Sequence, residues 1–139
     1  MQILVFILLS ITSAASAATE SIECLFTKFH LANHINPKMT GYSVINQSLS
    51  LINLKTSEAT LKLQGDKRAT NSTTWVKQGK GNFESTVTSY IGNFGEILTL
   101  EHILGENSKG LNGWYNASLI SSNVNTTSTS LGKCLVKNA

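Results

Sequence analysis

The chain has 139 residues, 14% of them charged, and a formal net charge of +3. This length is sufficient for one domain and leaves little room for a second. The small basic excess does not indicate a nucleic-acid partner, and we expect none.

The first seventeen residues carry no charged side chain. They contain an apolar run over residues 3–11, followed by Ala15 and Ala17 in the spacing typical of a signal-peptide cleavage site. The run is shorter than the roughly 20 residues that cross a bilayer as a helix. We therefore predict a secretory signal over 1–17 and one mature domain over 18–139. This domain would be secreted or periplasmic, with no transmembrane segment after cleavage.

Short strand-like runs separated by Gly, Asn and Ser fill the mature sequence, a pattern typical of all-β proteins. In chain order, strands are expected at 22–31, 42–45 and 48–55 (one bent strand or two), 59–63, 73–78, 83–90, 95–104, 114–120 and 131–136. The parity of the apolar residues changes near Leu51, which predicts a β-bulge there. Segment 121–130 is rich in Ser and Thr, and its threonines favour an exposed strand over a loop.

About seven to nine short strands joined by hairpins predict a small antiparallel up-and-down β-barrel, with a β-sandwich as the alternative. Cys24 lies near the start of the mature chain and Cys134 near its end. In an exported protein such a pair predicts a disulfide, which would bring the first and last strands together.

No catalytic set is evident in the mature chain. Asp66 is its single aspartate, no G-x-S-x-G pattern occurs, and GKGN at 79–82 is too short for a phosphate loop. His30 and His34 stand four apart, but on a strand that runs into a loop this spacing does not define a metal site. We expect a non-enzymatic protein without cofactor or metal.

Basic residues cluster around two adjacent turns in the middle of the chain, with one aromatic residue between them. They are Lys62, Lys67, Arg68, Lys77 and Lys80, and the aromatic residue is Trp75. Together they predict a cationic rim for an anionic partner. The competing interpretation is that these lysines keep loop tips soluble and protect strand edges.

Three further residues are candidates for ligand or surface contact. His102 shares parity with Leu98 and Leu100, which predicts an inward side chain that contacts a ligand or is hydrogen-bonded at the rim. In 114–120, alternation assigns Tyr115 to the interior and Trp114 to the outer surface, where it could contact a partner.

Four N-x-S/T sequons mark asparagines that would carry glycans only in a eukaryotic source. They are Asn46, Asn71, Asn116 and Asn125.

The sequence thus predicts an exported, disulfide-closed binding protein whose partner is a protein, a glycan or a small apolar ligand. The alternative is an inhibitor or surface-contact protein that docks onto another protein through its loops. An interior pocket near His102 would favour ligand binding. A filled core with an exposed apolar and cationic loop patch would favour docking.

Overall fold

The computed structural model describes residues 20–54, 58–61, 69–78, 87–102 and 113–137. Within these ranges the chain forms strands and one short 3-10 turn. The elements are β1 (Ser21–Asn33), η1 (Pro37–Met39), β2 (Gly41–Ile52), β3 (Glu58–Leu61), β4 (Thr74–Gln78), β5 (Val87–Gly92), β6 (Ile97–His102), β7 (Gly113–Ser122) and β8 (Thr126–Lys137).

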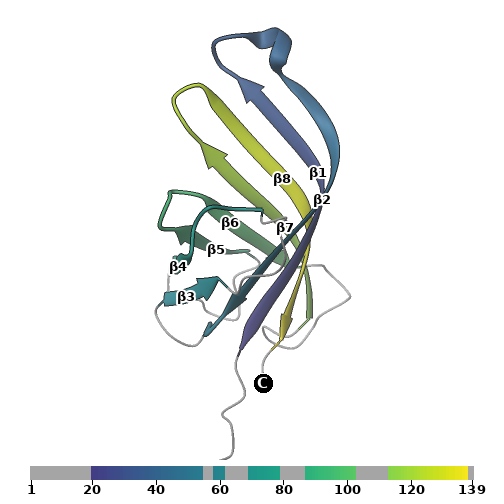
Figure 1. Cartoon of the computed structure of the whole chain (residues 1–139). Helices are drawn as coiled ribbons and strands as arrows, with labels where there is room; N and C mark the ends of the chain where they lie inside the picture. The colour runs from purple at the N-terminus through teal and green to yellow at the C-terminus, as the bar shows by residue number, and fades with distance from the viewer. Residues whose placement is uncertain (1–19, 55–57, 62–68, 79–86, 103–112, 138–139) are drawn as a thin grey trace, which may run out of the picture.

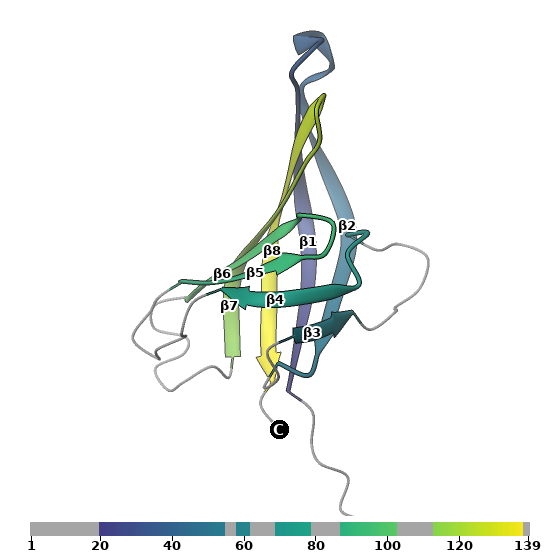
Figure 2. The same cartoon turned by 90° about the vertical axis from the view of Figure 1, so that its left-hand side faces the viewer.

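The eight strands form one antiparallel sheet in which each strand pairs with the next and β8 returns to pair with β1. The sheet therefore closes in a ring, as Figures 1 and 2 show. The predicted all-β, up-and-down order is confirmed. The strands belong to one closed sheet rather than two packed sheets, so the sandwich alternative is wrong.

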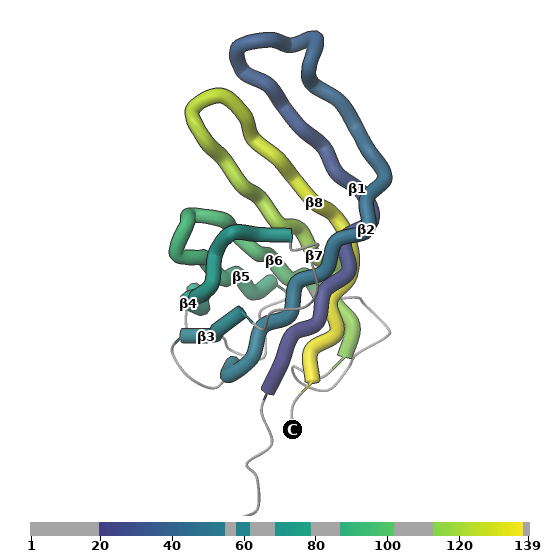
Figure 3. Tube along the Cα trace, viewed as in Figure 1, coloured from purple at the N-terminus to yellow at the C-terminus, as the bar shows by residue number. Residues whose placement is uncertain are grey.

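The strands differ greatly in length, and this difference shapes the molecule. Within the described residues, β1, β2, β7 and β8 have 13, 12, 10 and 12 residues, whereas β3 to β6 have between 4 and 6. The long strands continue beyond the short ones as two hairpins, seen at the top of Figures 1 and 3. We call residues 28–45 and 121–129 the arm, and the remaining described residues the ring.

One irregularity interrupts the ladder between β1 and β2, at Thr27. Residues 45–46 of β2 lie opposite it, which is the arrangement of a β-bulge. The predicted bulge near Leu51 is wrong, because Leu51 lies in regular register. The parity changes after the strand instead, where Asn53 adopts a left-handed φ of 63° and Leu54 packs against the core. The bulge marks the level at which β1 and β2 leave the ring.

The hydrophobic core lies inside the ring. Alternate residues of each strand point inward, because successive side chains of a strand face opposite sides of the sheet. Phe26, Leu51, Trp75 and Leu98 have 0% exposed surface. Burying an apolar side chain of this size stabilises the fold by about 1.5–3 kcal/mol, so the ring holds most of the hydrophobic stabilisation.

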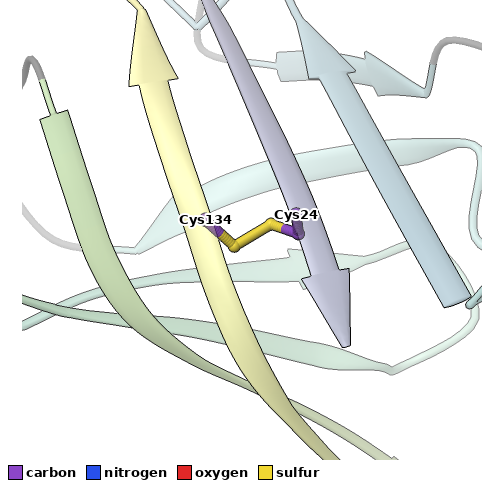
Figure 4. The surroundings of a disulfide bond; sticks show 2 residues. All are labelled: Cys24 and Cys134. Atoms are coloured by element: carbon purple, nitrogen blue, oxygen red, sulfur yellow. A yellow bond between two sulfur atoms is a disulfide. The ribbon is translucent and has the colours of Figure 1, made fainter. Parts of the chain in front are cut away.

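The predicted disulfide between Cys24 and Cys134 is confirmed. The two residues are directly opposite in the register of β1 and β8, with their Cα atoms 4.0 Å apart (Figure 4). Both are buried. The bond therefore fastens the first strand to the last at the point where the ring closes.

Candidate functional site

The interior of the ring is filled near the end where Glu20 lies. A cavity of about 20 Å³ remains there, lined by Glu20, Lys77, Tyr90 and Tyr115 together with apolar neighbours. This space suits about one water molecule, whereas small-molecule sites usually measure about 300–1,000 Å³. This cavity is too small for such a ligand.

The two tyrosines at this cavity are held in their neutral form. Burial, with smaller contributions from the charge of Glu20 and from Tyr115, raises the pKa of Tyr90 to about 12. Burial also raises the pKa of Tyr115. Their phenol groups therefore act as packed side chains with polar tips rather than as bases.

A second polar cluster surrounds Glu96, which is 4% exposed. The hydroxyl of Ser72 donates to Oε2 of Glu96, and the N–H of Asn71 donates to Oε1 at 3.1 Å. Burial raises the pKa of Glu96, but hydrogen bonds from Ser72, Thr70 and Asn71 outweigh it and leave the pKa below the usual value.

This cluster is a structural tether rather than a reactive centre. Ser72 has no exposed surface, and its oxygen also accepts the N–H of Phe94 at 3.0 Å. The bonds connect the segment before β4 to the turn between β5 and β6. A buried carboxylate with several donors stabilises such a connection, because each charged hydrogen bond contributes about 1.5–3 kcal/mol.

The tip of the β1–β2 hairpin is built on asparagine side chains. Oδ1 of Asn33 accepts the N–H groups of Ile35 at 3.0 Å and Asn36 at 2.8 Å. Oδ1 of Asn36 in turn accepts the N–H of Lys38 at 3.2 Å, where η1 begins. Such side-chain caps fix the backbone of a turn without a hydrophobic core beneath it.

The tip of the β7–β8 hairpin uses the same device and is attached to the first tip. Oδ1 of Asn123 accepts the N–H groups of Asn125 at 2.9 Å and Thr126 at 2.8 Å. The N–H of His34 donates to the carbonyl of Asn125 at 2.8 Å, and the ring of His34 is hydrogen-bonded to Thr127. Both tips are therefore ordered and joined.

Apolar side chains project from these ordered tips. Ile35 is 72% exposed, Met39 is 62% exposed and Val124 is 93% exposed. Lys38 is exposed between the first two. We call these four residues the tip patch. The arm contains no Asp or Glu, so the charge of the tip patch is positive.

A groove runs along the outer face of the arm over β2, β1 and β8. Its volume is about 350 Å³, and its lining is Lys28, Phe29, His30, Tyr42, Ser43, Val44, Thr129 and Leu131. The rings of His30 and Tyr42 lie against each other with centroids 4.4 Å apart. The groove is largely apolar, and the β2 side of it is the most exposed.

The predicted cationic rim is not brought together by the described residues. Lys62, Lys67, Arg68 and Lys80 lie outside them. Lys77 is half-buried at the small cavity of the ring. Trp75 has no exposed surface and therefore takes no part in a surface rim.

The other predicted contact residues divide between the two faces of the ring. Tyr115 is 5% exposed and Trp114 is 46% exposed, as the alternation predicts. His102 ends β6 in register with Tyr115, but its side chain lies outside the described residues. All four sequon asparagines are exposed: Asn46, Asn71, Asn116 and Asn125. Their glycosylation stays a prediction.

The sequence did not predict the tip patch, because residues 32–41 were interpreted only as a polar connection between two strands. A signal was present, since asparagines at 33 and 36 are typical turn-capping residues and isolate Ile35 and Met39 on the loop. The groove had no such signal. The groove depends on which residues of β1, β2 and β8 become neighbours on one face of the sheet.

Within the described ranges, no helix has the length and apolar character required to cross a membrane. The same ranges contain no group of three or more His, Cys, Asp or Glu side chains arranged to hold a metal ion. Comparisons with protein-family models, curated proteins and solved structures find no match to this chain.

Proposed function

We propose that this chain is an exported, non-enzymatic binding protein that docks onto another protein through the tip patch. The observation that carries the proposal is the exposure of Ile35, Met39 and Val124, by 72%, 62% and 93%, on turns held by side-chain hydrogen bonds. Large apolar groups on fixed, projecting turns bind a partner at a low entropic cost, because the turns are already ordered.

The interior of the ring also favours docking onto another protein over binding of a small ligand, the two functions that the sequence predicts. The described cavity inside the ring has only about 20 Å³ and is too small for a small apolar ligand. A larger described space, the groove of about 350 Å³, lies on the outer face of the arm. A filled core combined with an apolar and cationic loop patch favours protein docking over ligand storage. The buried Ser72–Glu96 pair is likewise suited to structure rather than to catalysis.

The chemistry of the tip patch indicates what the partner surface offers. Ile35, Met39 and Val124 require an apolar recess, and Lys38 requires a carboxylate at its margin. Because the arm contains no acidic residue, an acidic partner would approach it without like-charge repulsion. We therefore propose a protein partner with an apolar recess bordered by Asp or Glu.

Export is part of this proposal. The predicted signal over 1–17 lies outside the described residues. The Cys24–Cys134 disulfide supports export, because such bonds persist mainly in oxidising compartments.

The test compares two variants of the mature protein as baits for the native exported fraction, with chemical cross-linking and quantitative mass spectrometry. The tip variant combines Ile35→Ser, Met39→Ser and Val124→Ser. The control is Phe94→Ser, which removes a side chain of similar exposure (68%) from the β5–β6 turn. We expect the tip variant to lose about tenfold or more of a specific partner that the control retains.

Both variants should unfold at the same temperature as the wild type, since all four side chains are exposed. A partner that binds all three proteins equally would show that docking does not use the tip patch. Binding of a small apolar compound inside the ring, measured in a competition assay, would instead favour the ligand-binding alternative.

A further inference from the structure

In the part of the chain that the structure describes, β2 has a free edge over residues 41–47. On one side it pairs with β1 along its length, and on the other side its described pairs with β3 are at Leu51 and Ile52. The carbonyl of Ser48 accepts the N–H of Ala69. Between Gly41 and Gln47, no described strand pairs with this edge. Alternate backbone N–H and C=O groups of an edge strand point outward and can pair with another strand.

The sequence of this edge lacks the usual protection against strand pairing. Natural edge strands carry lysines, prolines or inward charges that prevent association. Here no charged residue and no proline occurs from residue 41 to residue 54. Tyr42 and Val44 are 86% and 91% exposed, although aromatic and β-branched residues are the ones that stabilise strand pairs.

We propose that a second copy of this chain pairs with the free edge of β2, antiparallel, about a two-fold axis at Ser43. This register places Tyr42 opposite Val44 of the partner subunit, and the symmetry repeats the pair. Cross-strand pairs of an aromatic and a β-branched side chain are favourable. Because the edge is uncharged, a copy of itself meets no like-charge repulsion along it.

The groove on the outer face agrees with this arrangement. Tyr42 and Val44 form its β2 wall and are its most exposed apolar members. In the paired sheet, Tyr42 and Val44 of the partner subunit continue this wall on the same face. The two projecting sheets thereby become one continuous sheet, and the outward backbone groups of residues 41–45 gain partners.

The tip patch and the free edge have no residue in common, so different substitutions test the two proposals. In the proposed register, Met39 lies level with Gln47 of the partner subunit, so each tip patch borders the paired edge. A dimer of this kind presents two tip patches at opposite ends of one sheet. Two linked patches would bind a surface with repeated partners more strongly than one patch does.

The first test is sedimentation equilibrium of the mature, disulfide-bonded protein over a range of concentrations. Val44→Lys adds a charge to the edge, and Val124→Lys is the matched control, because Val124 has nearly the same exposure (93%) on the other hairpin. We expect a reversible wild-type dimer, at least about tenfold weaker dimerisation for Val44→Lys, and no change for Val124→Lys.

The second test examines the register with single cysteines under mild oxidation. Ser43→Cys should form an intermolecular disulfide efficiently, since residue 43 faces its own copy across the two-fold axis. Asn46→Cys is exposed on the same edge but lies opposite Thr40 of the partner subunit, so it should cross-link poorly.

Two results would overturn the proposal. One is a wild type that stays monomeric up to roughly 1 mM, a concentration that reveals even transient interfaces. The other is equal cross-linking of Ser43→Cys and Asn46→Cys. The Ile35, Met39 and Val124 variant should still dimerise, which separates this proposal from tip-patch docking.

Discussion

The ring and the arm are parts of the same strands, yet they bury their residues very differently. The ring holds the whole cluster of buried apolar side chains, the disulfide and the buried Glu96. The arm has no buried residue over 28–45 and 121–129. Its backbone is held by the strand ladder, and its tips are held by the side chains of Asn33 and Asn123.

This difference teaches how a small protein can separate stability from recognition. The ring supplies the hydrophobic free energy, because its inward residues leave water. The arm inherits its order from strands that the ring already fixes, so its side chains are free to remain exposed. Changes in the ring should therefore affect unfolding, whereas changes in the arm should affect binding.

The largest expected effect is that of the Cys24–Cys134 bond. It joins residues 110 apart in sequence, and in the chain-entropy model closing such a loop stabilises the fold by about 4–5 kcal/mol. Reduction should lower the free energy of unfolding by this amount in urea titrations. A Cys24→Ala/Cys134→Ala variant should match the reduced protein and not respond to reductant. Equal urea midpoints for the oxidised and reduced wild type would show that the disulfide does not stabilise the ring.

Two phenylalanines on β1 provide a direct comparison of ring and arm. Phe26 is fully buried in the ring, whereas Phe29, three residues later, is half-buried in the arm. Phe26→Ala should lower the free energy of unfolding by about 3–5 kcal/mol through lost burial and a new cavity. Phe29→Ala should cost about 1 kcal/mol or less. Similar losses measured by chemical denaturation would show that the arm also carries core packing.

The smallest of the three effects concerns Glu96 and depends on pH. Because its pKa is lower in the folded state than the ordinary 4.5, Glu96 stabilises the fold above that value. This stabilisation disappears as the pH falls through the folded pKa. Glu96→Gln should lower the free energy of unfolding by about 1–3 kcal/mol at pH 7, and the difference from wild type should shrink in acid.

The matched control for this prediction is Glu101→Gln, because Glu101 is exposed on the neighbouring strand β6. Its effect should stay within about 0.5 kcal/mol at all pH values. A Glu96→Gln difference that persists unchanged in acid would show that the carboxylate charge does not contribute. The stability of both variants is measured by thermal unfolding between pH 3 and 7, because carboxylates titrate in this range.

Much of the fold follows from local patterns in the sequence. Alternation on β7 correctly assigns Tyr115 to the interior and Trp114 to the outside, and the pairing of Cys24 with Cys134 is correctly predicted. The threonines of 126–130 correctly favour a strand. The bulge was misplaced, because a change of parity also results from a turn after the strand, as at Asn53.

The candidate site was less predictable for a physical reason. Trp75 was grouped with the predicted cationic rim because it lies between the basic residues in sequence, but in the structure it is buried in the core. The tip patch and the free edge of β2 depend on how far β1, β2, β7 and β8 continue past their shorter neighbours. No local pattern encodes that difference, because the sequence of a strand does not show whether another strand pairs with it.

The sequence by itself determined the all-β class, the inward and outward faces of the strands and the pairing of two cysteines. It could do so because side-chain alternation and disulfide chemistry are local or pairwise properties. Only the tertiary structure decided where the ring ends and the arm begins. That boundary is fixed by the closure of eight strands of unequal length, which is a property of the whole sheet.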